Sequence, residues 1–417
     1  MPATSQQTSV LERFLRYVQL DTTSDSASPS VPSTAKQLVL LDQLVDELKA
    51  LGVKDAARDE FGIVMATLPA TSSRTTVPTI GFLAHVDTSP ELSGAGVKPI
   101  VHRNYDGRDL VLPDVPDLVL SPRQDADLAA KHGEDIVTAS GTTLLGADDK
   151  SGVAVVMAAV EHLVKHPEIA HGPIRISFTP DEEIGRGVRH FDVKRFGARC
   201  AYTLDGAGLG TLEAETFSAD SMTVTFQGRN THPGFAHGVM VNAIKVAADF
   251  VNRLPTDTLS PETTKDTEGF VHPNDITASV DRTIVHFIVR DFETSKLAMK
   301  EDYLETLAND TIRDWPGSSA SFEIRESYRN MRDAVAKHPE IVELAREAIR
   351  RTGVTAIEGR IRGGTDGSIL SEMGLPTPNL FSGQHRFHSR LEWVSVQDME
   401  IAVKVVVNLA QLWEQRA

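Results

Sequence analysis

Hydrophobic residues near the start of the chain recur every three or four positions and predict two amphipathic helices. The first begins at about Ser9, where Ser9 and Glu12 have the spacing of a capping box. The second follows Ser33 and ends at Gly52. The apolar faces of the two helices would contain Val10, Leu11, Phe14, Leu15 and Val18, and Leu38, Leu41, Leu44, Val45 and Leu48.

Short apolar runs bounded by turn residues predict buried strands. These runs span residues 63–68, 80–84, 174–178 and 200–204. The segment 90–145 is rich in Pro, Gly and Asp, so we expect loops there and a hairpin that pairs residues 136–139 with residues 142–145. The almost uniformly apolar stretch 153–160 predicts a buried helix.

The pattern changes near Glu215 to the order strand, helix, two strands, helix, strand. These elements span residues 222–227, 239–254, 276–280, 284–289, 294–312 and 320–324. This order is that of the split βαβ, or ferredoxin-like, arrangement. We therefore expect an inserted α+β domain at residues 216–326, between two segments of a larger α/β domain at 1–215 and 327–417.

The last segment again alternates helices and strands. Helices are predicted at residues 338–352, from 367 to about 374, and from 395 to the end, with a strand at 378–381. The turn Gly363-Gly364-Thr365-Asp366-Gly367 lacks the Lys of a P-loop and the spacing of a dinucleotide fingerprint. We interpret it as a tight strand-to-helix turn near a functional site.

Composition excludes several classes of function. A chain of 417 residues with a net charge of -16 is long enough for two or three domains and too acidic for nucleic acid or an anionic membrane surface. Cys200 is the only cysteine, so no internal disulfide and no thiolate metal cluster is expected. The amino terminus resembles no signal peptide and no apolar run could span a bilayer. We expect a soluble, cytoplasmic protein.

Ionisable side chains gather where the predicted strands end and where the buried helix begins. These residues are His85, Asp148, Glu182, Glu183 and Asp205. Ligands of an open α/β sheet bind at the carboxyl ends of its strands, so the five side chains are expected in one crevice. Adjacent side chains point apart, so one glutamate could bind a metal while the other takes a proton from water. Asp87 lies two residues after His85, on the same face of an extended chain, and could orient the imidazole.

Each of these residues also has a simpler interpretation. Asp148 and Asp149 could only cap a helix, because Asp is favoured at helix N-termini. Paired glutamates are common on surface turns, and His85 could lie in an ordinary loop. The candidate ligands are one fewer than a two-metal site requires, and either His385 or His388 could be the missing ligand.

Several motifs, taken in order, resemble the tripeptide aminopeptidases of a two-zinc family that also contains carboxypeptidases, dipeptidases and deacylases. They are HVDTSPE, TTLLGADDKSG, FTPDEEIGRG, HPGFAHGVMVNA, VRDF, IRGGTDG and PNLFSG with the following FH. The resemblance covers nearly the whole chain. It implies a catalytic domain with a mixed, mostly parallel sheet and flanking helices, and an inserted ferredoxin-like domain that acts as a lid or dimerisation domain.

The resemblance also assigns roles to residues. One zinc would be held by His85, Asp148 and Asp205, and the other by Asp148, Glu183 and His388, with Asp148 as the bridge. Glu182 would be the general base, and Asp87 would support His85. A cis peptide bond is implied between Asp148 and Asp149.

Substrate contacts are expected on positively charged residues. His232 resembles a family histidine that stabilises the oxyanion, and it would need domain closure or a second subunit of a homodimer. Arg290, Arg362 and Arg332 are candidates for binding the carboxylate of a short peptide. Each could instead be an ordinary surface residue.

The function that this resemblance implies is that of a zinc-dependent tripeptide aminopeptidase. Two alternatives use the same residues differently. A related carboxypeptidase, dipeptidase or N-acyl amino acid deacylase would share the metal site, and peptides blocked at either end would distinguish them. A catalytically inactive peptide-binding protein is the alternative outside catalysis.

Overall fold

The computed structural model describes residues 9–417, and residues 1–8, where the predicted range 1–215 begins, lie outside the described part. The described chain forms two compact units. The first unit contains residues 9–214 with Met331–Arg360 and Thr365–Ala417, and the second contains Glu215–Asn330 and Ile361–Gly364. The short segment 361–364, predicted in the larger domain, groups with the second unit, where the Ile361 carbonyl accepts a hydrogen bond from the N–H of Phe217 (3.0 Å).

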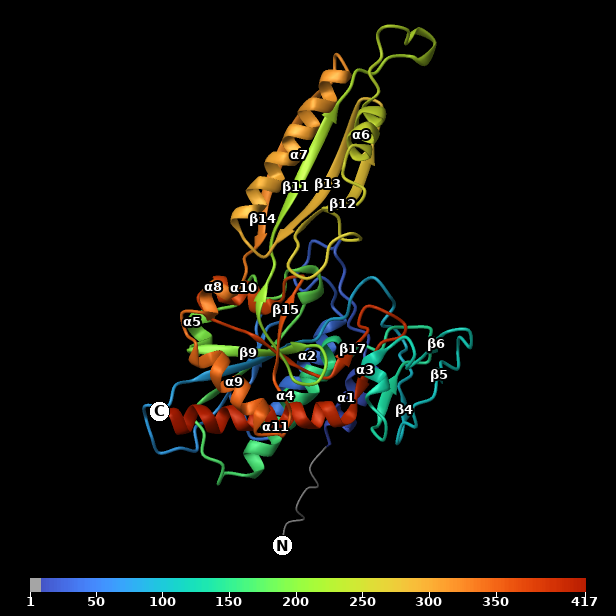
Figure 1. Ribbon diagram of the computed structural model, residues 1–417. Helices are drawn as coiled ribbons and strands as arrows, with labels where there is room; N and C mark the ends of the chain where they lie inside the picture. The colour runs from blue at the N-terminus through green and yellow to red at the C-terminus, as the bar shows by residue number, and fades with distance from the viewer. Residues whose placement is uncertain (1–8) are drawn as a thin grey trace. The chain divides into compact units, whose positions relative to one another are not determined.

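An eight-stranded sheet, which includes the labelled strands β9 and β15 of Figure 1, forms the centre of the first unit. Its order is β1-β2-β8-β3-β9-β16-β10-β15. Its strands are β1 (Ala57–Arg58), β2 (Val64–Leu68), β3 (Ile80–His85), β8 (Ile174–Thr179), β9 (Cys200–Gly206), β10 (Thr211–Thr216), β15 (Ile357–Ile361) and β16 (Asn379–Phe381). The four neighbours β8, β3, β9 and β16 run parallel, whereas β1-β2, β2-β8 and β16-β10 are antiparallel. The predicted mixed sheet is confirmed, with its parallel part limited to the middle.

Helices cover both faces of this sheet. On one face the buried helix α4 (Ala147–Lys165) packs on β3 and β9, and α1 (Val10–Tyr17) and α11 (Val396–Arg416) pack against α4. The predicted capping box of Ser9 and Glu12 is present at the start of α1. On the other face a smaller apolar cluster includes Phe196 and Leu370. The remaining helices of this unit are α2 (Gln37–Ala50), α3 (Ala126–Ala129), α5 (Val193–Phe196), α8 (Arg332–Val335), α9 (Glu340–Arg350) and α10 (Asp366–Glu372).

A four-stranded sheet beside the main one corrects the predicted hairpin. Its order is β17 (Gln384–His385), β18 (Trp393–Ser395), β7 (Ile136–Thr138) and β4 (Ile100–His102), and a separate pair joins β5 (Leu110–Val111) to β6 (Val119–Leu120). The prediction that residues 136–139 pair with residues 142–145 is wrong. Strand β7 pairs on both sides with strands distant in sequence, and the N–H of Leu145 donates to the carboxylate of Glu392 (2.7 Å).

The second unit has the predicted ferredoxin-like order. Its elements are β11 (Ser218–Gln227), α6 (Ala243–Asn252), β12 (Phe270–Ala278), β13 (Arg282–Asp291), α7 (Ser295–Asp314) and β14 (Ser319–Tyr328). The antiparallel sheet has the order β12-β13-β11-β14. Alternate residues of β11 and β13, such as Met222, Val224, Val285 and Phe287, form a core of their own with α6 and α7. This separate core explains why the insertion is readable from the sequence.

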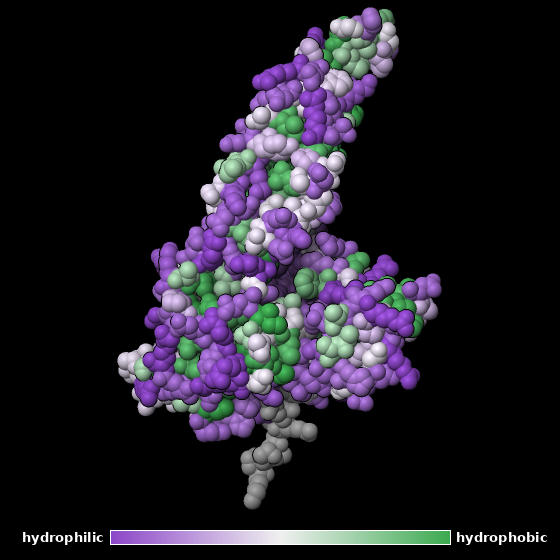
Figure 2. All heavy atoms as spheres, viewed as in Figure 1, coloured by the Kyte–Doolittle hydropathy of each residue, from purple (hydrophilic) through white to green (hydrophobic). Residues whose placement is uncertain are grey.

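The surface shown in Figure 2 is mostly hydrophilic, and its hydrophobic residues form scattered patches. Within residues 9–417, no helix combines the length and apolar character that crossing a bilayer requires. The cysteine Cys200 is buried in β9.

Candidate metal centre

The parallel strands bring the predicted polar residues to one edge of the main sheet. His85 is the last residue of β3 and is paired in register with Thr179, the last residue of β8. Asp205 lies one residue before the end of β9, inside the strand rather than after it. Glu182 opens the 3-10 turn η1 (Glu182–Ile184), three residues beyond β8. These positions put the side chains together, because parallel strands end on the same side of a sheet.

His85, Asp148 and Asp205 form the first group of candidate metal ligands, with one ligand atom from each residue within 4.8 Å of the others. The Nε2 atom of His85 lies 3.1 Å from Asp148 Oδ1 and 3.6 Å from Asp205 Oδ1. All three side chains are largely shielded from solvent. Nitrogen and oxygen donors at such spacing suit a divalent metal such as zinc.

Asp148 also belongs to a second group, with Glu183 and His388. The Nε2 atom of His388 lies 2.7 Å from Glu183 Oε2 and 3.4 Å from Asp148 Oδ2. The two oxygens of Asp148 therefore point to different groups, Oδ1 to the first and Oδ2 to the second. One carboxylate shared in this way can bridge two metal ions.

Asp148 and Asp149, at the start of α4, make different contacts. Asp149 Oδ1 accepts a hydrogen bond from the N–H of Gly152 (3.2 Å), and Oδ2 accepts one from the N–H of His85 (3.3 Å). Asp149 therefore caps the regular helix, whereas Asp148, in a non-helical conformation, faces the ligand groups. The simpler interpretation, that both residues only cap the helix, is correct for Asp149 alone. The peptide bond between the two residues is cis, as the resemblance implied.

Asp87 connects the imidazole to the glutamate turn. Its carboxylate lies 3.3 Å from Nδ1 of His85. The two carboxylate oxygens accept the backbone N–H groups of Glu182 (3.0 Å) and Glu183 (3.2 Å). Asp87 therefore fixes the orientation of His85 and the position of the turn at the same time.

Glu182 lies beside the ligands but belongs to neither group. Its Oε2 atom is 3.9 Å from Nε2 of His85, too far for a hydrogen bond. Burial raises the pKa of its carboxyl well above the usual value, and the negative charges of Asp205 and Glu183 add to this effect. A carboxylate that lies beside candidate metal ligands but outside their groups can accept a proton from water.

The charges of the centre favour a bound cation. Burial raises the pKa of Glu183 to about 8 and that of Asp205 to about 6. Burial would lower the pKa of His388, but the carboxylates of Asp148 and Glu183 outweigh it and raise this pKa to about 11. The Oε1 atom of Glu183 is buried and has no hydrogen-bond partner among the described residues. Such an excess of buried carboxylate fits divalent metal ions, which attract the charges that otherwise repel each other.

The structure distinguishes the two histidines that spacing left open. His388 faces Asp148 and Glu183, whereas His385 lies flat on the ring of Trp393, with centroids 3.9 Å apart. His385 is in neither ligand group, and burial lowers its pKa to about 4.

Two residues near the centre, Glu392 and Gln384, were missed in the sequence, and Asp366 was predicted only as part of a turn near a functional site. Glu392 accepts backbone hydrogen bonds from the segment that carries Asp148. Gln384 Nε2 lies 3.4 Å from Asp205 Oδ1, and Asp366 accepts a hydrogen bond from the hydroxyl of Thr179 (2.6 Å). The available signal was a charged residue inside an apolar run, Leu391-Glu392-Trp393, which indicates a buried partner.

The arginines proposed for substrate binding differ in how many of their donors are used within the protein. Arg362 donates to the carbonyls of Asp266 and Glu268 (2.9 Å each) and to the hydroxyl of Thr264 (2.9 Å). Arg290 donates only to the carbonyl of Arg362 (3.3 Å), and its buried Nε has no partner within the described chain. Arg362 is therefore committed to holding a loop of the second unit, and Arg290 keeps unused donors.

The other two candidates lie on the surface of different units. His232 is exposed in the second unit, where its Nδ1 accepts the N–H of Gly234 (3.1 Å). Arg332 belongs to the first unit and lies 3.5 Å from the carboxylate of its neighbour Asp333. The proposed role of His232 stays a prediction, because His232 and the candidate metal ligands belong to different units.

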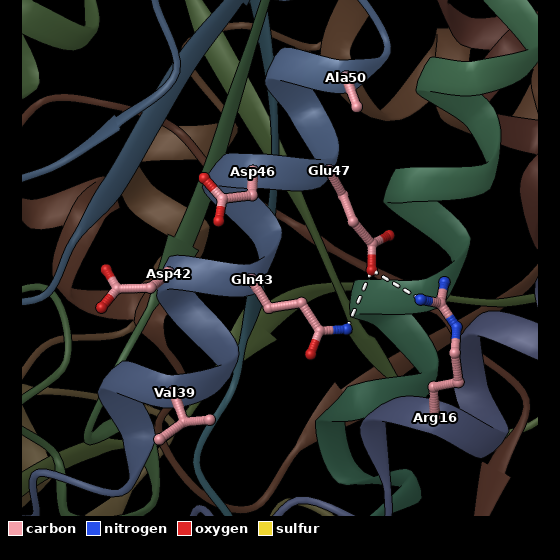
Figure 3. Close-up of a pocket in the computed structure, with 7 residues that line it drawn as sticks. All are labelled: Arg16, Val39, Asp42, Gln43, Asp46, Glu47 and Ala50. Atoms are coloured by element: carbon pink, nitrogen blue, oxygen red, sulfur yellow. Dashed lines mark hydrogen bonds and ion pairs between the residues drawn. The ribbon is translucent and has the colours of Figure 1, made fainter.

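A hollow beside α2 has no part in this centre (Figure 3). It is lined by Arg16, Val39, Asp42, Gln43, Asp46, Glu47 and Ala50. Glu47 accepts hydrogen bonds from Arg16 (3.1 Å) and Gln43 (3.0 Å). Asp42 is paired outside the hollow, with Arg58 (2.6 Å), so the hollow is lined by ordinary surface ion pairs of α1 and α2.

Residues 127–412 match the model of the peptidase family M20/M25/M40. A peptidase T of Geobacillus sp. strain WCH70 is 46% identical over 408 residues, covering 98% of this chain and 99% of the relative. The same fold is present in the aminopeptidase PepT of Bacillus cereus ATCC 10987, which is 24% identical with a TM-score of 0.74 and coverages of 98% and 99%. A tripeptidase of Staphylococcus aureus is 21% identical with a TM-score of 0.77 and the same coverages.

Proposed function

The chain belongs to the peptidase family M20/M25/M40, and on this premise we propose that it is an aminopeptidase that uses two zinc ions to release the first residue of short peptides, chiefly tripeptides. The observation that carries the proposal is the sharing of Asp148 between two ligand groups, with Glu182 beside them. The 46% identity to a peptidase T over almost the whole chain supports the choice among the activities of the family.

The residues would divide the metals as follows. His85, Asp148 and Asp205 would hold one ion, and Glu183 and His388 would hold the other with the second oxygen of Asp148. When bound, zinc supplies the Lewis acidity that makes water a nucleophile near neutral pH and polarises the scissile carbonyl. Asp87 would keep His85 in the orientation that its contacts define.

Glu182 would move the proton. It takes the proton of the attacking water and gives it to the amine that leaves when the peptide bond breaks. His232 would stabilise the oxyanion as an additional hydrogen-bond donor. Because His232 belongs to the second unit, this role requires a lid-like movement of that unit or a homodimer in which a second subunit supplies the residue.

Arg290 is the arginine that we propose for the substrate carboxylate. It has unused donors, whereas the donors of Arg362 are occupied by the protein itself. Replacing Arg290 by Ala is expected to raise the KM of a tripeptide about tenfold or more, since a hydrogen bond to a charged group contributes about 1.5–3 kcal/mol. Steady-state kinetics with tripeptides and tetrapeptides measure this effect.

The control for Arg290 is Arg282→Ala, an exposed arginine at the other end of the same strand. A tripeptide amidated at its carboxyl end should be nearly insensitive to Arg290→Ala, because it lacks the charge that the arginine binds. An unchanged preference for tripeptides over tetrapeptides in this variant would exclude Arg290 from length selection.

The proposed activity is tested with one tripeptide in three forms: free, acetylated at the amino end and amidated at the carboxyl end. We expect only peptides with a free amine to be cleaved, with release of the first residue. Chelation should abolish cleavage and added zinc should restore it, because the metals activate the water. Chromatography of the products after each treatment measures the result.

Other outcomes of this test identify the alternatives. Cleavage of the acetylated peptide, or release of the last residue, would indicate a deacylase or carboxypeptidase with the same metal centre. Binding of all three forms without cleavage would indicate a peptide-binding protein. The cytoplasmic location that the single cysteine suggests stays a prediction.

A further inference from the structure

Glu392 is a buried carboxylate whose hydrogen bonds all go to the segment that carries Asp148. One oxygen accepts the N–H groups of Leu145 (2.7 Å) and Gly146 (2.8 Å), and the other accepts the N–H of Asp148 (3.0 Å). The side chain of Glu392 is almost completely removed from solvent. A buried carboxylate with three donors is held firmly, because each donor compensates part of the cost of removing the charge from water.

The start of α4 needs such a partner from outside the helix. The residue before the helix is Gly146, at φ +80°, and it has no side chain that could cap the first turn. The first N–H groups of a helix have no partners within it. Asp149 caps only the regular part that follows, so Glu392 accepts the N–H groups of the irregular turn. This turn determines where the Asp148 carboxylate points.

Glu392 also belongs to the loop that carries His388. The two residues are four positions apart, and the N–H of Glu392 donates to the carbonyl of Ser389 (3.3 Å). Trp393 follows in β18, which pairs with β7 and β17, and its indole N–H donates to Asp125 (3.0 Å). The backbone that follows Glu392 is therefore anchored in a sheet. The carboxylate of Glu392 links this anchored segment to the turn of Asp148.

We propose that Glu392 is a positioning residue for the metal centre: it sets the distance between the shared ligand Asp148 and the ligand His388, and so preorganises the second ligand group. The inference rests on the proposed two-zinc function. It adds a residue that belongs to neither ligand group and acts through the backbone of Asp148. Residues of this kind orient the ligands before the metal arrives, which lowers the reorganisation that binding requires.

If Glu392 were only a helix cap, it would make the same hydrogen bonds, but its replacement would have different consequences. Loss of a cap lowers the stability of the whole domain and does not change metal affinity once the protein is folded. Loss of a positioning residue changes metal affinity in the folded protein. Metal affinity and the stability of the metal-free protein therefore separate the two roles.

The experiment compares Glu392→Gln with Glu400→Gln, in which an exposed glutamate of α11 is changed in the same way. In Glu392→Gln the amide NH2 has no acceptor among the three backbone donors, so at least one hydrogen bond is lost. Zinc dissociation constants are measured by competition with a chromophoric chelator, and thermal unfolding is followed for the metal-free proteins. We expect zinc affinity at one or both sites to fall about 10- to 100-fold in Glu392→Gln and to be unchanged in Glu400→Gln.

Each outcome decides the proposal. Weakened zinc binding, measured at a temperature at which the metal-free variant is folded, supports positioning whether or not its unfolding temperature is lowered. Wild-type zinc affinity in Glu392→Gln, with or without lowered stability, contradicts it. If Glu392→Gln does not fold, the same measurements on Glu392→Asp, which keeps the charge on a shorter side chain, decide in the same way. A wild-type protein that binds no zinc would instead contradict the proposed function, and this result is distinguishable from the others.

Discussion

Replacing Glu182 by Gln is expected to reduce kcat for tripeptide hydrolysis by about two to four orders of magnitude, the usual contribution of a general acid-base residue. The change keeps the size of the side chain and removes the group that takes the proton. Glu182 is in neither ligand group, so the variant should still bind two zinc ions. Steady-state kinetics together with the metal content of the purified protein measure both effects.

The matched control is the same substitution one residue later. Glu183 Oε2 contacts His388 at 2.7 Å and belongs to the second ligand group. Glu183→Gln is therefore expected to lose zinc from one site. If Glu182→Gln lost metal instead, Glu182 would be a ligand and the proposed division of labour between the two glutamates would be wrong.

Replacing His388 by Ala is expected to remove one zinc ion and to lower kcat/KM by about a hundredfold or more, since Lewis-acid stabilisation is worth several kcal/mol. The physical reason is that His388 is the one nitrogen donor of the second group. Metal analysis of the variant and its activity in excess zinc measure the effect. Excess zinc should restore little activity, because the site has lost a ligand.

His385→Ala, at the end of β17 and three residues before His388, is the control for this variant. His385 is buried against Trp393, so its loss should lower the free energy of unfolding by about 1–3 kcal/mol through lost packing. It should leave two zinc ions bound. A His385→Ala protein that lost zinc while His388→Ala retained it would reverse the assignment of the two histidines.

Local patterns in the chain were enough for much of the fold. The capping box at Ser9, the buried helix after Asp149 and the ferredoxin-like order after Glu215 are all present. These features were predictable because helical and strand periods, caps and turns involve residues close in sequence. The family motifs were readable for a similar reason, since each is a short segment at the end of a strand or helix.

Long-range pairing is where the local pattern failed. The predicted hairpin of residues 136–139 with residues 142–145 does not form, because β7 finds better partners in β4 and β18. A strand with neighbours on both sides satisfies more backbone groups than a short hairpin does. No local signal in residues 136–145 records the existence of those distant strands.

The sequence by itself determined the kinds of candidate metal ligand, their places at strand and helix ends, and the family to which the chain belongs. Only the tertiary structure showed that His388, and not His385, lies beside Asp148. It also showed that Asp149 caps the helix while Asp148 faces both candidate ligand groups, and that Arg362 holds a loop while Arg290 keeps unused donors. The physical reason is that these choices depend on distances between segments far apart in the chain. Residue type and spacing limit which contacts are chemically possible. The packing of distant segments determines which of these contacts form.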